Sequence, residues 1–120
     1  MKKRILIIDD DPHTRMLLGL MLEGYDIAEA ENGEKGLRAH RENPADLVIT
    51  DIIMPDKEGI ETIRELKQDW PELKIIAVSA GGYAEPKDYL ELATLVGADD
   101  TIRKPVEPDE LIGAVRKLIG

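Results

Sequence analysis

Residues 4–10 read Arg-Ile-Leu-Ile-Ile-Asp-Asp, an apolar run that ends on two acids. A short apolar run without alternating polar positions is typical of a strand that is covered on both faces of a parallel sheet. Three later runs also end on a polar residue: 47–50 before Asp51, 75–78 before Ser79, and 101–103 before Lys104. The strands of a parallel α/β sheet place their carboxyl ends at one edge, where such folds bind ligands. The sequence therefore predicts that one edge gathers Asp9, Asp10, Asp51, Ser79 and Lys104.

Segments with helical periodicity separate these runs, and the alternation predicts a mainly parallel sheet built from βα units. The predicted strands cover residues 4–9, 27–31, 47–50, 75–78 and 100–103, and a helix is expected after each of them. Apolar and polar residues alternate in 27–31, which places that strand at an edge of the sheet. Asp11 followed by Pro12 predicts the cap and first turn of the first helix, and Gly24 predicts its end. The apolar residues of this helix are expected in the core: Met16, Leu17, Leu20 and Met21.

Composition limits the classes of protein that the chain can represent. Its 120 residues suit one domain, residues 1–120, and an apolar content of 42% is enough for one core. Sixteen Lys and Arg against twenty-five Asp and Glu give a formal net charge of −9, which disfavours direct binding to nucleic acid and favours protein partners. Cysteine is absent, and the opening apolar stretch is too short for an export signal or a membrane span. We therefore expect a soluble, cytoplasmic protein without membrane insertion.

The predicted edge gathers negative charge that needs a partner. Carboxylates that share one site cannot all ionise cheaply, so Asp9, Asp10 and Asp51 imply a bound cation. Carboxylate, carbonyl and water oxygens suit Mg²⁺, whereas the lack of His and Cys at this edge argues against zinc. One alternative is that the acids after the first strand only cap the helix. Asp11 alone satisfies that role, which leaves Asp9 and Asp10 for the cation.

Asp51 ends the most buried run, where a carboxylate needs a metal or a cationic side chain to stay charged. Lys104 is expected to pair with it, and Ser79 to present a hydroxyl from the next strand. Cation, ammonium and hydroxyl would then surround the three oxygens of a phosphoryl group, whose transfer depends mainly on positioning and charge stabilisation. The sequence thus predicts that Asp51 is a nucleophile that becomes an aspartyl phosphate.

Four signatures, in order and over essentially the whole chain, closely resemble those of the receiver domain of bacterial two-component response regulators: Ile7-Ile8-Asp9-Asp10, Asp51-Ile52-Ile53-Met54-Pro55 with Gly59, Ser79-Ala80, and Lys104-Pro105. The resemblance implies a flavodoxin-like (CheY-like) doubly wound α/β fold. Its five-stranded parallel sheet would have the order 2-1-3-4-5 and be accompanied by five helices. The whole chain would then be a single receiver domain without an output domain.

The resemblance also divides the edge residues between a phosphoryl group and Mg²⁺: Asp51 accepts the phosphoryl group, which Ser79 and Lys104 contact, while Asp10, Asp51 and the Ile53 carbonyl bind the ion directly and Asp9 binds it through water. It implies a cis Lys104-Pro105 bond. The donor would be a phosphohistidine on a sensor histidine kinase or a histidine phosphotransfer protein, and phosphorylation would change binding to a downstream protein target. Such a protein is not an enzyme with an external substrate, because it catalyses only its own phosphorylation and dephosphorylation.

Two positions depart from the family pattern. Receivers commonly carry an aromatic residue on the fifth strand, where this chain has Thr101, and often a phenylalanine after the Lys-Pro pair, where it has Val106. An aromatic readout of phosphorylation is therefore not expected here. Gly81 and Gly82 are the alternative source of movement, in the loop after Ser79.

Two other functions share some of these residues. A small Mg-dependent haloacid-dehalogenase-like phosphatase would use Asp9 and Asp11 as its Asp-x-Asp motif and Asp99-Asp100 as its acidic pair, although its lysine should precede that pair. A flavodoxin that binds flavin would need glycine and hydroxyl residues after the first strand, where this chain has aspartates. Whether the chain is a stand-alone regulator, a relay intermediate or part of a longer protein stays open.

Overall fold

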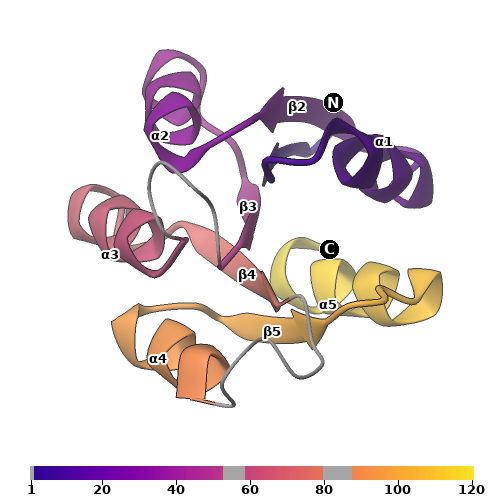
Figure 1. The fold of residues 1–120 in the computed structure, drawn as a ribbon. Coiled ribbons are helices and arrows are strands. Elements are labelled where there is room, and N and C mark those ends of the chain that lie inside the picture. The colour runs from indigo at the N-terminus through magenta and orange to yellow at the C-terminus, as the bar shows by residue number, and fades with distance from the viewer. Residues whose placement is uncertain (1, 53–58, 80–87) are drawn as a thin grey trace.

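The computed structural model describes residues 2–52, 59–79 and 88–120 (Figure 1). Five strands alternate with five helices along the described chain: β1 (Arg4–Ile8), α1 (Pro12–Met21), β2 (Asp26–Ala30), α2 (Gly33–Glu42), β3 (Leu47–Asp51), α3 (Gly59–Asp69), β4 (Lys74–Ser79), α4 (Asp88–Val96), β5 (Asp100–Arg103) and α5 (Pro108–Ile119). The strands form one sheet in the order β2-β1-β3-β4-β5, and every pairing is parallel. The predicted fold is therefore confirmed. Among the described residues, no helix has the length and apolar content needed to cross a membrane.

Each face of the sheet has its own hydrophobic core, because successive side chains of a strand point to opposite faces. Along β1, Ile5 and Ile7 belong to the core under α1 and α5, whereas Leu6 and Ile8 belong to the core under α2, α3 and α4. Figure 1 shows these two helix layers on opposite sides of the sheet. β3 lies in the middle and is buried at every position, while β2 lies at an edge and is partly exposed, as its alternating sequence predicts.

Asp11 fixes the start of α1. Its side chain accepts hydrogen bonds from the His13 N–H and the Thr14 hydroxyl, each at 3.0 Å. The hydrogen bond from His13 is the main reason that the pKa of the Asp11 carboxyl is below its ordinary value. After the helix, Gly24 takes a φ of +98°, in the region that favours glycine. The predicted cap is therefore confirmed, whereas the helix ends at Met21 with Leu22 as its C-cap, so Gly24 belongs to the turn that follows.

The expectation that all apolar residues of α1 lie in the core is wrong for three of them. Their side chains are exposed: Met16 at 50%, Leu17 at 42% and Leu20 at 70%. The stripe that faces the sheet is instead made by Leu18 and Leu22, which are one helical turn apart and almost fully buried. Residues 16–22 are apolar at nearly every position, so the sequence alone does not reveal which stripe faces inward.

His40 is a buried polar residue at the opposite end of the sheet from the predicted site. It is 2% exposed near the end of α2, its ring meets Trp70 edge-on at 4.5 Å, and its Nδ1 accepts a hydrogen bond of 3.0 Å from the Ala45 N–H. A ring nitrogen that accepts a hydrogen bond is unprotonated. Burial, with a smaller contribution from the Arg4 guanidinium, holds the pKa of His40 below its ordinary value.

Mild acid is expected to weaken the fold through His40. In the unfolded chain this ring titrates near its ordinary pKa of about 6.5, so the stability it confers is complete above that pH. It is lost as the pH falls from there through the lower pKa of the folded state. Urea unfolding at about pH 7.5 and about pH 5 should show a larger loss in the wild type than in His40→Asn, which keeps an acceptor but cannot be protonated. Equal losses would contradict the prediction; His13→Asn, in an exposed position, is the matched control and should behave as the wild type.

Candidate functional site

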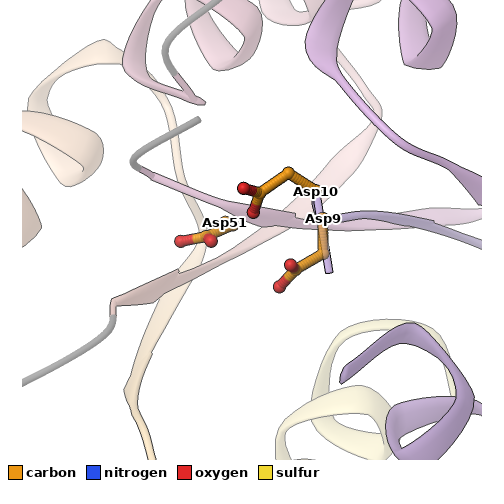
Figure 2. Close-up of side chains that lie close together, drawn as sticks. All are labelled: Asp9, Asp10 and Asp51. Carbon is orange, nitrogen blue, oxygen red and sulfur yellow. The ribbon is translucent and has the colours of Figure 1, made fainter. Parts of the chain in front are cut away.

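The three acids predicted to share a site lie together where β1 and β3 end. Ile8 is in register with Thr50, so Asp9 and Asp51, the next residue on each chain segment, stand at the same level. Asp9, Asp10 and Asp51 each offer a carboxylate oxygen within 4.8 Å of the others (Figure 2). Asp9 and Asp51 are buried, at 2% and 7% exposure, whereas Asp10 is exposed. The cluster therefore opens to solvent at Asp10.

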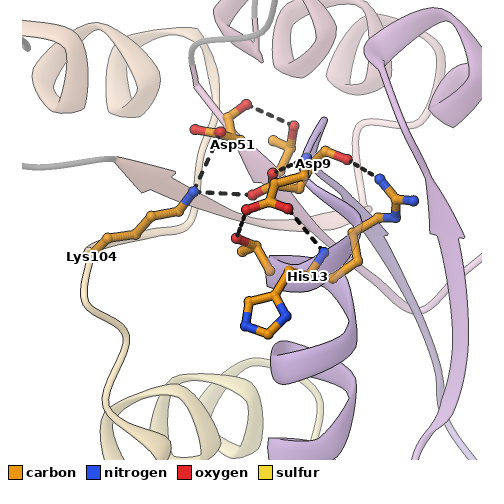
Figure 3. Close-up of polar contacts among 8 residues, drawn as sticks. Asp9, His13, Asp51 and Lys104 are labelled. Atoms are coloured by element: carbon orange, nitrogen blue, oxygen red, sulfur yellow. Dashed lines mark hydrogen bonds and ion pairs between the residues drawn. The ribbon is translucent and has the colours of Figure 1, made fainter.

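Lys104 bridges two of these carboxylates. Its Nζ donates a hydrogen bond of 3.1 Å to Asp9 Oδ2 and lies 3.5 Å from Asp51 Oδ2 (Figure 3). Burial by itself disfavours the ammonium, but the Asp51 and Asp9 carboxylates outweigh burial and raise the pKa of Lys104 above its ordinary value. The sequence predicts Asp51 as its partner, and in the structure the shorter contact is to Asp9. Lys104 is thus held in its charged form between the two acids.

Ser79 reaches the same edge from β4. Asp51 is in register with Val78, so Ser79 extends one residue beyond Asp51 on the neighbouring strand. The Lys104 N–H donates a hydrogen bond of 2.7 Å to the Ser79 carbonyl, which ties the end of β4 to the segment after β5. The Lys104-Pro105 bond is cis, as predicted. The sheet therefore brings the hydroxyl-bearing residue and the lysine to the acid cluster.

The sequence also gives expectations for four other positions, of which the structure describes one. The Ile53 carbonyl, expected to bind Mg²⁺, lies outside the described residues, and so do Gly81 and Gly82. Thr101 is on β5, partly buried and in register with Ala77. A small hydroxyl side chain therefore occupies the position on β5 where the resemblance led us to look for an aromatic ring.

The structure separates the residues that a haloacid-dehalogenase-like phosphatase would need together. Asp11 caps α1 rather than joining the cluster. Asp99 accepts hydrogen bonds from Lys67 Nζ at 3.1 Å and from the Ile75 N–H at 2.8 Å. Ile75 lies near the beginning of β4, at the opposite end of this strand from Ser79. Asp99, of the acidic pair that a phosphatase would need, thus lies where the strands begin. Asp9, of its Asp-x-Asp motif, lies where they end.

Arg15 also touches the cluster, although the sequence analysis did not single it out. Its Nη1 donates a hydrogen bond of 2.6 Å to the backbone carbonyl of Asp9. Its place in the first turn of α1 is the one available signal, because helical side chains tilt toward the helix N-terminus and therefore toward β1. Every residue type has a backbone carbonyl, so the identity of the acceptor residue does not indicate this contact.

The donor atoms of the cluster fit a hard divalent cation. They are carboxylate oxygens, which Mg²⁺ prefers, and the exposed side of the cluster leaves room for the several waters that this ion keeps. Among the residues that the structure describes, three carboxylates face one ammonium, and a divalent cation would balance the excess negative charge of this group.

Replacing Asp10 by asparagine should distinguish two effects on stability: the repulsion among the three carboxylates and their binding of a cation. Without a divalent cation, Asp10→Asn is expected to be more stable than the wild type by about 1 kcal/mol, the Coulomb energy of two unit charges some 4 Å apart in water. With Mg²⁺, the wild type should gain stability and the variant should gain much less. Thermal unfolding with Mg²⁺ and with EDTA measures both effects. A Mg²⁺-dependent gain that survives unchanged in Asp10→Asn would contradict the assignment.

Known proteins are similar to this chain in sequence and in fold. Residues 5–116 match the response regulator receiver domain. The chain belongs to this family. It is 37% identical to the chemotaxis protein CheY of Bacillus subtilis over 122 residues, which cover 99% of each chain, and 38% identical to CheY of Thermotoga maritima over 121 residues, which cover 98% of each. The crystal structure of a CheY-like receiver domain protein from Methanospirillum hungatei is similar with a TM-score of 0.87 at 32% identity, covering 98% of this chain and 93% of that one.

As a receiver domain, the chain is a signalling module of the two-component type. Receiver domains act as switches between histidine kinases or phosphotransfer proteins and downstream targets, and they bind Mg²⁺ at an acidic pocket. In this receiver domain the corresponding acids are Asp9, Asp10 and Asp51.

Proposed function

We propose that this receiver domain is the phosphoacceptor switch of a two-component phosphorelay and that Asp51 takes the phosphoryl group. The observation that carries the proposal is the surroundings of Asp51: a buried carboxylate with an ammonium 3.5 Å away and two further carboxylates beside it. Asp9 holds Lys104, since its Oδ2 accepts from the ammonium while its Oδ1 accepts from the Asp11 N–H at 2.9 Å. Asp51 is buried beside the same ammonium whereas Asp10 is exposed, so we assign the phosphoryl group to Asp51.

The reaction needs an attacking oxygen and groups that stabilise the phosphoryl oxygens. An Asp51 carboxylate oxygen attacks the phosphorus of a phosphohistidine, a P–O bond forms as the P–N bond breaks, and the imidazole leaves with the electron pair and takes a proton from solvent. The Lys104 ammonium and the Ser79 hydroxyl then contact two phosphoryl oxygens. Lys104 is already fixed by Asp9, and preorganised charge of this kind is the main contribution of a protein to phosphoryl transfer.

Mg²⁺ belongs to this proposal. Asp10 and Asp51 would bind the ion, with Asp9 acting through a water and the Ile53 carbonyl as a further ligand. Bound there, the ion supplies positive charge for the phosphoryl oxygens. A water oxygen later attacks the phosphorus, the P–O bond to Asp51 breaks, and inorganic phosphate leaves, which restores the Asp51 carboxylate. Because these are its only reactions, the protein acts as a switch and has no external substrate to turn over.

Two exposed apolar areas are proposed as protein-binding surfaces. On α1, Met16, Leu17 and Leu20 are exposed, and Leu17 lines a hollow of about 210 Å³ that Lys104 of the site also lines. This area suits the histidine kinase or phosphotransfer protein, which must bring its phosphohistidine close to Asp51. On α4, Leu92 and Leu95 are exposed at 42% and 80%. We assign the face of α4, β5 and α5, to which these leucines belong, to a downstream target. The net charge of −9 disfavours nucleic acid as that target, and a cytoplasmic location is part of the proposal.

Intact mass measurement after incubation with acetyl phosphate tests the chemistry without a cognate kinase. With Mg²⁺ present, we expect the mass of one phosphoryl group to be added, and with EDTA in place of Mg²⁺ we expect no addition. Neutral hydroxylamine should remove the group, because it cleaves an acyl phosphate whereas a phosphoserine resists it. A wild type that gains no mass under any Mg²⁺ concentration would refute the proposal.

A further inference from the structure

The backbone of Asp9 is held on both sides by hydrogen bonds outside its own strand. Its N–H donates to the Ala30 carbonyl on β2 at 3.1 Å, and its carbonyl accepts from Arg15 Nη1 at 2.6 Å. The second contact is short and charge-assisted, the class of hydrogen bond that is stronger than a neutral one. It fixes the orientation of the peptide group that joins Asp9 to Asp10.

Arg15 is itself held by a second contact. Its Nε lies 3.0 Å from Glu29 Oε1, and the Arg15 side chain is 16% exposed while that of Glu29 is 47% exposed. Glu29 is on β2, in register with Ile7 of β1. The planar guanidinium therefore spans from the edge strand to the segment after β1 with two donors in a fixed geometry. A salt bridge to a half-exposed Glu would stabilise the fold only slightly by itself, so the carbonyl contact is the more consequential of the two.

The orientation of the Asp10 side chain depends on these Arg15 contacts more than the orientations of Asp9 and Asp51 do. Within the part of the chain that the structure describes, the Asp10 carboxylate forms no hydrogen bond or ion pair, whereas Asp9 and Asp51 both contact Lys104. The direction of the Asp10 side chain is therefore set by its backbone. The peptide group that precedes Asp10 is the one that Arg15 holds.

We propose that Arg15 is a positioning residue for the cation site: by holding the Asp9 carbonyl, and with Glu29 as its support, it directs the Asp10 carboxylate toward Asp51. This inference rests on the proposed function, since it concerns the same Mg²⁺. Residues that orient metal ligands without touching the metal typically change its affinity by 10- to 100-fold. Arg15 acts in that way through the backbone.

Calorimetric titration with Mg²⁺, without any phosphodonor, measures the effect directly. Arg15→Met should weaken Mg²⁺ binding about tenfold, and Arg15→Lys should fall between Arg15→Met and the wild type, because lysine keeps the charge but not the two-donor fork. Glu29→Met should weaken Mg²⁺ binding by about two- to fivefold. This variant replaces Arg15→Met in the titration if Arg15→Met does not fold. Arg38→Met, which removes an exposed arginine of α2, is the matched control and should bind as the wild type does.

A second measurement separates positioning from general loss of structure. If Arg15 only orients the cation site, excess Mg²⁺ should restore the rate at which Arg15→Met reacts with acetyl phosphate to the wild-type value. Unchanged Mg²⁺ affinity in Arg15→Met, or a rate that excess Mg²⁺ does not restore, would overturn the inference and leave the proposed function standing. A wild type that binds no Mg²⁺ would overturn both.

Discussion

We expect the Asp51→Asn variant to gain no phosphoryl mass from acetyl phosphate and Mg²⁺ under conditions in which the wild type is fully modified. The substitution keeps the size and shape of a side chain at the end of a fully buried strand, so the fold should persist. An amide oxygen is a far weaker nucleophile than a carboxylate oxygen and forms no stable phosphoryl adduct. The expected effect is therefore complete loss of the adduct, measured by intact mass.

The controls for this prediction use the other acids of the cluster. Asp10→Asn should lower the rate of adduct formation, and high Mg²⁺ should partly restore it, because in the proposed site Asp10 binds the ion and does not react. Circular dichroism should show the same helix and strand content in Asp51→Asn as in the wild type. If Asp51→Asn still gained the full mass, another residue would be the acceptor, and fragment masses of the modified protein would identify it.

The architecture was predictable because each strand and the start of α1 carry strong local signals. β1, β3 and β4 are uninterrupted apolar runs, which are typical of central strands, and these three strands do occupy the middle of the sheet. The alternating residues of β2 correctly indicated an edge strand. Polar residues at the strand ends converge for a geometric reason, since parallel strands finish at one edge. The positions of Asp51, Ser79 and Lys104 there follow from the parallel direction of the strands that they end or follow.

Other features were not predictable because they depend on tertiary packing. The inward stripe of α1 is decided by how the helix lies on β1 and against α5, and neighbouring apolar residues on both sides of that stripe give no sequence signal. The choice of Lys104 between Asp9 and Asp51 depends on a few tenths of an ångström at the end of a flexible side chain. The contact of Arg15 with a backbone carbonyl involves no particular residue type in its partner.

Gly59 gives the other large expected effect, because it connects the stability of the fold to the geometry of Asp51. This residue begins α3, and its N–H donates a hydrogen bond of 2.6 Å to the Ile52 carbonyl. A Cβ added at Gly59 would lie 2.6 Å from the Ile52 Cα and closer still to the Asp51 carbonyl oxygen. These are backbone atoms, which cannot turn aside as a flexible side chain can. Gly59→Ala should therefore destabilise the protein by about 3 kcal/mol, the upper part of the range for overpacking.

Gly113→Ala is the matched control, because it places the same methyl group in a helix without a clash. Gly113 is exposed within α5, and its added Cβ would meet no described atom within 4 Å. Alanine is favoured over glycine in helices, so this variant should be more stable by about 0.5–1 kcal/mol. Urea unfolding compares the two variants, and Mg²⁺ titration of the folded Gly59→Ala should show weakened binding because the backbone that carries Asp51 must shift. If Gly59→Ala matched the wild type in both measurements, the close approach of α3 to the end of β3 would not be what places Asp51 in the site.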